Sequence, residues 1–373
     1  MKTPFRGFTA ILLKEFTVIL RDRTALFFMF FPPLIQLIAF GFALDTDVKN
    51  MRMVVLNEDR SVESRQLIEG FVNTGTFRVA GEVRSAQELA AEIRRGKAYV
   101  GLQIPPDYTR ELHAGRTAHV QMLIDGSSST IASSALNTAI AVAFRQSAVA
   151  LMQAVGRREL PVEVRPQILY NPAMRSPNFF VPGVIGLALQ IATVIATALS
   201  LVRERERGTL EQLMVSPLSP WGLMLGKLTP YLVVSMAMAG GLLLLSRVVF
   251  GIPIQGSVVL LLLAALLYIF ALLSLGLLIS TWAENHMQAL QMTMALMLPS
   301  VFFSGFIFPR ETMPWIFQAV SALIPATYFI ELMRAIILRG ATFADFGRQL
   351  LILGVMGGVL FSLCALRFKR KLA

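Results

Sequence analysis

Long uncharged apolar runs dominate the pattern of hydrophobic and polar positions along this chain of 373 residues. A hydrocarbon core about 30 Å thick is crossed by a helix of about 20 apolar residues. Runs close to that length predict spans at 24–44, 179–202, 228–245, 258–282, 287–308 and 350–366. The pattern therefore predicts an integral membrane protein of the α-helical class, with about six transmembrane helices.

Residues 1–23 precede the first run and combine apolar and basic positions at helical spacing. The apolar positions recur three or four residues apart, at Phe5, Phe8, Ile11, Leu12, Phe16 and Ile19. This spacing predicts an amphipathic helix lying in the cytoplasmic interface, with a plain extension of the first span as the alternative. The run 24–44 exceeds the apolar region of a signal peptide, about 7–15 residues, so an uncleaved anchor is predicted.

Residues 45–178 change character and predict an inserted external α/β domain with a long helix. Strand-like runs alternate with helical patterns: strands at 51–56, 77–83, 98–104 and 118–124, and helices at 61–73, 85–95 and 127–158. The stretch 126–144 is free of charge and long enough to be taken for a span. Its five serines, two threonines and one asparagine argue against insertion into a membrane.

Composition and charge narrow the class of protein. The chain is 55% hydrophobic and 15% charged, with a mean hydropathy of +0.63, whereas soluble domains carry roughly 25% charge. A cytosolic enzyme and a disordered chain are excluded, and the single Cys364 excludes an intrachain disulfide. Most of the net charge of +11 lies beside the ends of apolar runs, which predicts contact with membrane lipid and no nucleic-acid partner.

The basic residues also predict the orientation in the membrane. Lysine and arginine gather in 1–23, in the loop 203–227 and in the tail 367–373. Positive charge marks the cytoplasmic side, so both termini and this loop are predicted there. The domain 45–178 and the region 309–348 then lie outside. The predicted location is the bacterial cytoplasmic (inner) membrane, crossed several times.

Signals for catalysis are weak throughout the chain. The stretch 222–227 comes nearest to a phosphate-binding loop, but its spacing is wrong and Leu228 follows its lysine. His113 and His119 lie six residues apart with Asp125 further along, which falls short of the three or four convergent ligands of a metal site. We therefore expect no catalytic residue, no metal site and no nucleotide-binding motif on this chain.

The predicted spans contain no charged residue, which argues against transport driven by protons or sodium. Polar side chains within or beside spans are candidate contacts in a substrate pathway: Gln190, Ser235, Gln288 and Gln291. The alternative for each is a hydrogen bond between helices.

The loop after the second span has the most informative pattern. Charges alternate from 203 to 207, which predicts a solvated extension of the span. Gly208 can end that helix, and Thr209 with Gln212 has capping-box spacing for a short new one that Pro217 ends. Its apolar positions share one face: Leu210, Leu213 and Met214. The face predicts docking in a hydrophobic groove of a partner protein, or a helix lying flat on lipid.

This loop resembles the E-x-x-x-G-T-L-E-x-L-x-x-[ST]-P-L signature of type-2 ABC transporter permeases. Further stretches match the family in the same order along nearly the whole chain: 55–61, 125–127, 170–172, 304–309 and 324–328, with Glu331 and Arg334. Each motif alone is weak, whereas together they are specific.

The resemblance implies that 208–217 is a coupling helix seated in a separate ABC ATPase subunit. The residues implied in coupling are Glu204, Glu206, Gly208, Thr209, Leu210, Glu211, Leu213, Met214 and Pro217. ATP and Mg²⁺ would sit on that ATPase, with no cofactor on this chain. The resemblance also implies short re-entrant helices within 309–348 and a second permease subunit, in a homodimer or a heterodimer. A periplasmic adaptor is a further candidate partner.

The expected function is the transmembrane subunit of an ATP-driven ABC exporter. Spans rich in Phe, Met and Leu favour lipophilic or amphipathic cargo such as drugs. Export of lipid, polysaccharide or sodium is left open. The alternative from another class is a non-transporting envelope receptor or assembly protein with an external domain.

Overall fold

The computed structural model describes residues 7–43, 49–127, 129–155, 170–173, 175–206, 208 and 219–372. The chain forms two compact units. Met1–Asp45 and Leu169–Ala373 make one, called here the membrane unit, and Thr46–Ile168 makes the other, called the inserted unit. The boundary of the inserted unit falls before 178, because the chain is already helical from Ser176 onward.

Five helices of the membrane unit are long and apolar enough to cross a membrane, among the residues that the structure describes. They are α2 (Arg23–Ala43), α7 (Ser176–Glu206), α9 (Pro220–Phe250), α10 (Val258–Trp282) and α14 (Phe343–Leu372). A bent pair, α12 (Trp315–Ser321) and α13 (Pro325–Arg339), turns by 85° and makes a sixth candidate if it is one broken span. The protein is therefore a mostly helical integral membrane protein.

The predicted crossing at 287–308 stays a prediction. Helix α11 (His286–Phe303) covers most of that range, but it is not among the helices that qualify as spans. Its first turns carry His286, Gln288 and Gln291, and the helix ends at Phe303, so 304–308 adds no helical length. The bent pair that follows is either one broken span or a re-entrant loop.

Several helices run past their predicted ends. Helix α9 begins at Pro220, eight residues before the predicted 228, because Ser219 caps it there, and the charge of Lys227 is paired inside the helix bundle. Helix α14 spans Phe343–Leu372, with a kink at Phe346, instead of 350–366. Helix therefore covers 203–206 and 220–227 of the predicted loop 203–227, 343–348 of the predicted region 309–348 and 367–372 of the predicted tail.

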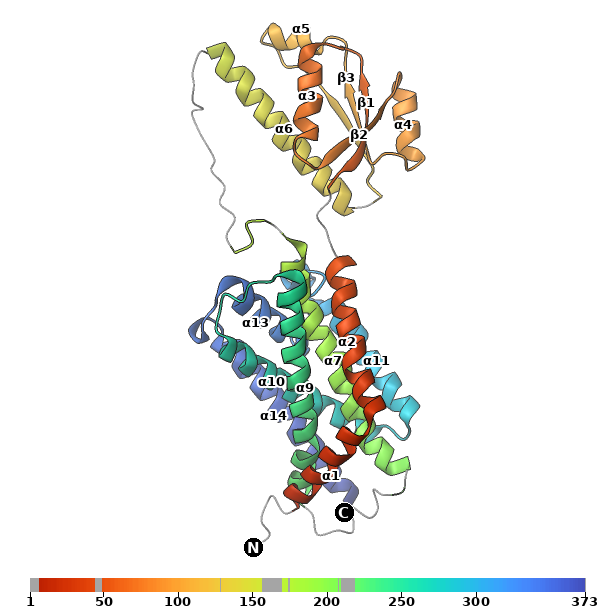
Figure 1. The fold of residues 1–373 in the computed structure, drawn as a ribbon, viewed down its shortest axis with the longest axis vertical. Coiled ribbons are helices and arrows are strands. Elements are labelled where there is room, and N and C mark those ends of the chain that lie inside the picture. The colour runs from red at the N-terminus through yellow and green to blue at the C-terminus, as the bar shows by residue number, and fades with distance from the viewer. Residues whose placement is uncertain are drawn as a thin grey trace. The chain divides into compact units, whose positions relative to one another are not determined.

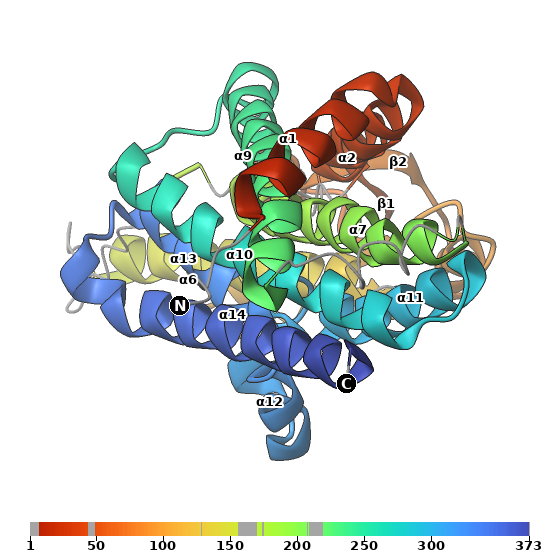
Figure 2. The ribbon, with the colours of Figure 1, turned by 90° about the horizontal axis from the view of Figure 1, so that it is seen from below.

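Helix α7 is the central element of the membrane unit, in contact with α2, α9, α10, α11 and α13 (Figure 2). Its contact with α10 is close because Gly276 has no side chain. A Cβ atom there would lie 2.1 Å from Oγ1 of Thr197 and 2.6 Å from the carbonyl oxygen of Val194. The hydroxyl of Tyr268 on α10 also donates to the carbonyl of Gly186 at 2.9 Å. These contacts fix α7 against α10 along most of its length.

Arg334 on α13 ties the bent pair to the ends of two other helices. Its guanidinium donates to the carbonyls of Gly305 at 2.8 Å and of Phe306 and Phe179 at 3.1 Å each. It also stacks over the ring of Phe179, 3.8 Å from the ring centre. Gly305 and Phe306 follow the end of α11 and Phe179 lies near the start of α7, so one arginine joins α13 to carbonyls of two other segments.

The inserted unit is a four-stranded mixed sheet with the order β2-β1-β3-β4. The strands are β1 (Met51–Asn57), β2 (Phe77–Glu82), β3 (Val100–Ile104) and β4 (Gln121–Ile124). Strand β1 is parallel to β2 and β3, and β4 is antiparallel to β3. The helices are α3 (Val62–Val72), α4 (Ala86–Arg94), α5 (Tyr108–His113) and α6 (Ser129–Val155). Helices α3 and α6 lie on one face of the sheet and α4 on the other (Figure 1).

The strands and long helices of this unit lie close to the predicted ranges. Ser85 caps α4 as expected, because its side chain accepts from the amide of Glu88. Helix α5 was not expected, since its six residues are too few to show a period. Helix α6 is not among the helices apolar enough to cross a membrane, in agreement with the prediction from its serines and threonines.

Candidate functional site at the end of helix α7

The amphipathic helix α1 (Phe8–Arg21) brings a carboxylate into the membrane unit. Ile11, Glu15 and Ile19 are spaced four residues apart and form its buried face. This face packs on α9, where Gly226 permits close approach: a Cβ atom there would lie 2.9 Å from Ile11. The apolar side of α1 therefore contacts protein, and its predicted place in the lipid interface stays a prediction.

Lys227 of α9 pairs with two carboxylates from two other helices. Its Nζ atom lies 3.0 Å from Oε1 of Glu15 on α1 and 2.9 Å from Oε2 of Glu204 on α7. The side chain of Lys227 is 2% exposed, and those of its two partners are 6% and 10% exposed. A buried charge of this kind persists only when it is paired, so the three helices must meet here.

Lys14 completes this group, called here the Lys227 cluster: Lys14, Glu15, Glu204 and Lys227. Nζ of Lys14 lies 2.5 Å from Oε1 of Glu204 and 3.6 Å from Oε1 of Glu15. Partial burial disfavours the ammonium, but the hydrogen bond to Glu204 and the charges of both carboxylates outweigh it and raise the pKa of Lys14 above its ordinary value. Two cations and two anions balance, so the cluster is neutral.

The residues on either side of Glu204 anchor the same helix end to further elements. Arg203 pairs with Asp22 at 3.4 Å, between α1 and α2. Arg205 donates to the carbonyl of Ala283, at the end of α10. Glu206 accepts from the amide of His286 at 3.0 Å and pairs with its ring, at the start of α11. Four consecutive residues of α7 thus contact four different places in the membrane unit.

Two of the predicted coupling residues, Glu204 and Glu206, lie in this helix end, and the others follow it in the sequence. Gly208 has a left-handed backbone with φ of 70°, which suits the end of a helix and favours glycine. The other implied positions lie outside the described residues: Thr209, Leu210, Glu211, Leu213, Met214 and Pro217. The described chain resumes at Ser219, which caps α9 by accepting from the amide of Gly222. The stretch 222–227, with its partial likeness to a phosphate-binding loop, is helical.

The candidate pathway residues separate into two groups. Gln190 and Ser235 are buried between helices, where Gln190 donates to Ser300 of α11 at 2.8 Å and Thr193 donates to Ser235 of α9 at 3.3 Å. Gln288 accepts from the backbone amide of Glu284, and Gln291 is exposed. The structure does not bring all four together. Oε1 of Gln190 is buried without a hydrogen-bond partner in the described part of the chain.

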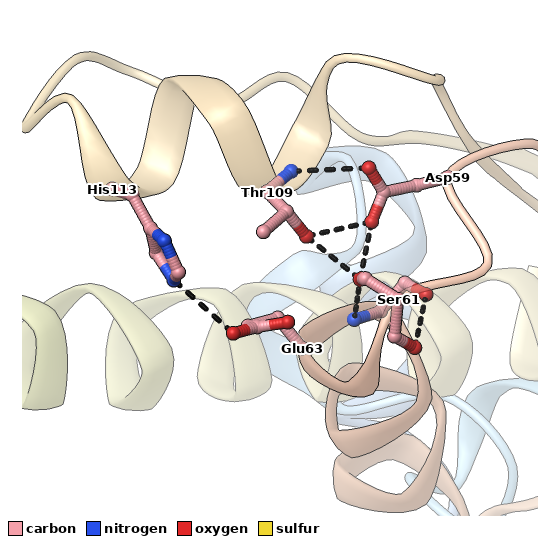
Figure 3. A network of polar contacts seen from close by, with 6 residues as sticks. Asp59, Ser61, Glu63, Thr109 and His113 are labelled. Carbon is pink, nitrogen blue, oxygen red and sulfur yellow. Dashed lines mark hydrogen bonds and ion pairs between the residues drawn. The ribbon is translucent and has the colours of Figure 1, made fainter.

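The inserted unit has a polar network of its own, at the ends of β1 and β3 (Figure 3). Asp59 accepts from Ser61 and, at 2.6 Å, from the hydroxyl of Thr109 on α5. His113 contacts Glu63 at 3.1 Å. The described residues contain no group of three or more side chains that could hold a metal ion. The network joins α5 to the loop after β1, which is a structural role.

Sequence reasoning identified Glu204 but not the rest of the Lys227 cluster. One signal was available: Glu15 occupies a position in the apolar face of α1, between Ile11 and Ile19, and an acid on such a face needs a buried partner. Lys227 gave no such signal, because a lysine at the start of an apolar run is typical of a membrane boundary.

Comparison with known proteins shows similarity along nearly the whole chain. The family described as ABC-2 family transporter protein matches residues 23–366. The "Probable multidrug ABC transporter permease YbhR" of Escherichia coli (strain K12) is 31% identical over 98% of this chain and 99% of its own length. The "Probable multidrug ABC transporter permease YbhS" of the same strain is 31% identical over 90% of this chain and 89% of its own length. The "ABC transporter G family member 20" of Dictyostelium discoideum is 24% identical over 89% of this chain and 46% of its own length.

Proposed function

The chain belongs to the ABC-2 family of transporter proteins and is the transmembrane subunit of an ABC exporter, from which we propose that it moves lipophilic or amphipathic compounds, including drugs, outward across the inner membrane. The word "multidrug" in the names of two similar permeases supports this cargo. ABC-2 permeases work with ATPase partners. ATP and Mg²⁺ are bound by that partner, and this chain carries no nucleotide-binding motif and no cofactor.

The observation that carries the proposed coupling to an ATPase is the anchoring of α7 immediately before the segment 208–217. Glu204 and Glu206 bond to α1, α9 and α11, and Lys227 holds the start of α9 to the same point. A force applied by an ATPase to 208–217 would therefore reach several helices at once. This gives Glu204 and Glu206 a role in transmission, while the leucine face of 208–217 supplies the docking surface.

The proposed topology places the docking surface on the cytoplasmic side. Both termini and the loop 207–219 lie in the cytoplasm, and the inserted unit lies outside. A second permease subunit, identical or different, completes the translocation pathway, and a periplasmic adaptor is a further candidate partner. Basic residues near the ends of the spans support this orientation.

Gln190 is the strongest candidate for a polar contact in the pathway. It lies on the central helix α7, and its amide oxygen has no hydrogen-bond partner in the described part of the chain. A buried acceptor without a hydrogen bond is costly, and a cargo molecule or a water can donate one to it. Ser235, Gln288 and Gln291 are weaker candidates, because each forms a local hydrogen bond or is exposed.

The proposal is tested by the ATPase activity of the reconstituted complex across a panel of compounds. Lipophilic and amphipathic compounds should stimulate hydrolysis, and Gln190→Leu should change which of them do so. Stimulation by oligosaccharide, by lipid or by sodium alone would reject the proposed cargo and leave the exporter assignment intact.

Coupling is tested by two variants within 208–217. Leu213→Asp places a charge in an apolar groove, at a cost on the order of several kcal/mol if it is unpaired, and should abolish association with the ATPase. Glu211→Arg should weaken coupling while the complex still assembles, because an exposed ion pair contributes only about 0–1 kcal/mol. Normal assembly and transport by Leu213→Asp would reject 208–217 as the docking helix.

A further inference from the structure

Helix α6 of the inserted unit has two apolar faces. One faces the core, where Ala135 and Val142 pack against α3 and the sheet. The other carries Leu136, Ile140 and Phe144, which are 52%, 59% and 68% exposed. These three residues are spaced four apart, so their side chains line up along one side of the helix. They are called here the α6 stripe.

The α6 stripe also lacks the charge that the other helices of this unit carry. No charged residue occurs from 127 to 144, and Arg145 is the one charged residue of Ser129–Val155. The other helices α3 and α4 have charged positions outside the core: Glu63, Arg65, Glu69, Glu88, Glu92 and Arg94. Helices α3 and α4 therefore carry charged residues on their outer sides, whereas the exposed side of α6 is apolar. This difference marks the α6 stripe as a contact surface.

The composition of α6 indicates what covers this surface. A helix that lies on a membrane carries lysine and arginine on its polar face, and α6 has only Arg145. A partner recognised by charge would need opposite charges on α6, and those are absent. A neutral face with large side chains at every fourth position, flanked by serine and alanine, fits a copy of itself, as in a two-fold symmetric contact.

We propose that the α6 stripe packs against the α6 stripe of a second copy of this chain, in an antiparallel helix pair centred on Ile140. Leu136 of one copy then faces Phe144 of the other. The two Arg145 side chains stand ten residues apart along the helix axis, about 15 Å, which exceeds the screening length of about 10 Å. A parallel pair would bring these two charges side by side. The inference rests on the proposed pairing of permease subunits.

Disulfide cross-linking of the full-length protein in membranes tests this arrangement. The native Cys364 is first replaced by serine, and Ile140→Cys is then oxidised with copper phenanthroline. We expect a covalent dimer that a reductant converts back to monomer. Phe144→Cys alone should stay monomeric, whereas Leu136→Cys combined with Phe144→Cys in one chain should cross-link. The matched control is Arg65→Cys on the charged side of α3, where no dimer is expected.

Several results would overturn the proposal. A monomeric Ile140→Cys that reacts fully with a soluble maleimide would show an uncovered face. A monomeric one that is protected from maleimide would show cover by something other than a second copy, and a cross-link to a different polypeptide would show another partner. The mass of the purified complex distinguishes failure of the α6 contact from failure of the subunit pairing. Two permease chains without a cross-link would reject the α6 contact alone. A single permease chain would reject the pairing itself.

Discussion

Nζ of Lys227 lies 2.9 Å from Oε2 of Glu204, and this ion pair joins the end of α7 to the start of α9. The chain between them contains the segment 208–217, so the two ends of the loop that carries it are held at one point. Glu15 of α1 binds the same lysine, 212 positions away in the sequence. The loop is therefore fixed to a third helix as well.

Removing the lysine from this cluster should destabilise the membrane unit strongly. In Lys227→Met, two buried carboxylates lose their shared cation, and breaking a buried ion pair costs about 3–5 kcal/mol. The thermal unfolding midpoint of the protein in detergent should fall. The matched control is Lys14→Met, whose side chain is 43% exposed and which should cost about 1 kcal/mol or less. Equal midpoints for the two variants would mean that the buried pairs add no stability.

Close contact between α7 and α10 predicts a different sensitivity at two glycines. In Gly276→Ala, the new methyl group meets the backbone of α7, with the carbonyl oxygen of Val194 at 2.6 Å. Overpacking of this kind costs about 1–3 kcal/mol. Gly240→Ala on α9 meets nothing within 4 Å and should leave stability unchanged or slightly higher. Because the obstacle is backbone, Thr197→Ala should not rescue Gly276→Ala.

The sequence predicts those elements of this fold whose signals lie within a single segment of the chain. Caps and periods are local, so α4 with its Ser85 cap and the alternating strands of the inserted unit appear near their predicted ranges. The predicted run began only at 228 because the partners that permit the buried charge of Lys227 lie in α1 and α7, and no local pattern reveals them. Helix α11 ends before the predicted run 287–308 does, because 304–308 is not helical.

The same distinction applies to the candidate site. The motif around Glu204 and Gly208 is contiguous, so a family resemblance can identify it. Glu15 and Lys227 belong to the site only because α1, α7 and α9 pack together in the folded chain. The sequence shows Gln190 as a polar residue in a span. That its amide oxygen lacks a hydrogen-bond partner among the described residues depends on how it packs against Ser300. Contacts between distant segments therefore decide whether a polar residue in a span is a pathway candidate or only forms a hydrogen bond between helices.

Acid should loosen the link between α5 and the loop after β1. Partial burial works against the Asp59 carboxylate, but hydrogen bonds from Ser61 and Thr109 outweigh it and lower its pKa. The stability from these bonds is complete above the unfolded pKa of about 3.9 and is lost as pH falls through the lower folded value.

We expect Asp59→Asn to remove this acid dependence and to cost about 1 kcal/mol at neutral pH. Hydrogen exchange of the backbone amide of Thr109, compared with wild type at each pH, measures the effect. Asp107→Asn is the control, because the Asp107 side chain caps no backbone amide. Exchange at Thr109 that is equally fast in wild type and Asp59→Asn at neutral pH would contradict the assigned role.

Labelling from the two sides of the membrane should distinguish the inserted unit from the carboxyl terminus. In a Cys364→Ser background, Arg110→Cys in the inserted unit should react with an impermeant maleimide added to intact cells. Arg370→Cys should react only after the membrane is opened. Labelling of both positions in intact cells would contradict the proposed topology.

The four anchors at the end of α7 constrain how that helix can move. Successive residues of a helix point about 100° apart, so the contacts of Arg203, Glu204, Arg205 and Glu206 surround nearly the full circumference. A helix held on all sides cannot roll about its own axis without breaking some of these bonds. It can tilt or slide together with the elements that hold it. The end of α7 is thus a rigid joint, and a push on 208–217 should arrive in the bundle as a concerted tilt rather than as a twist of one helix.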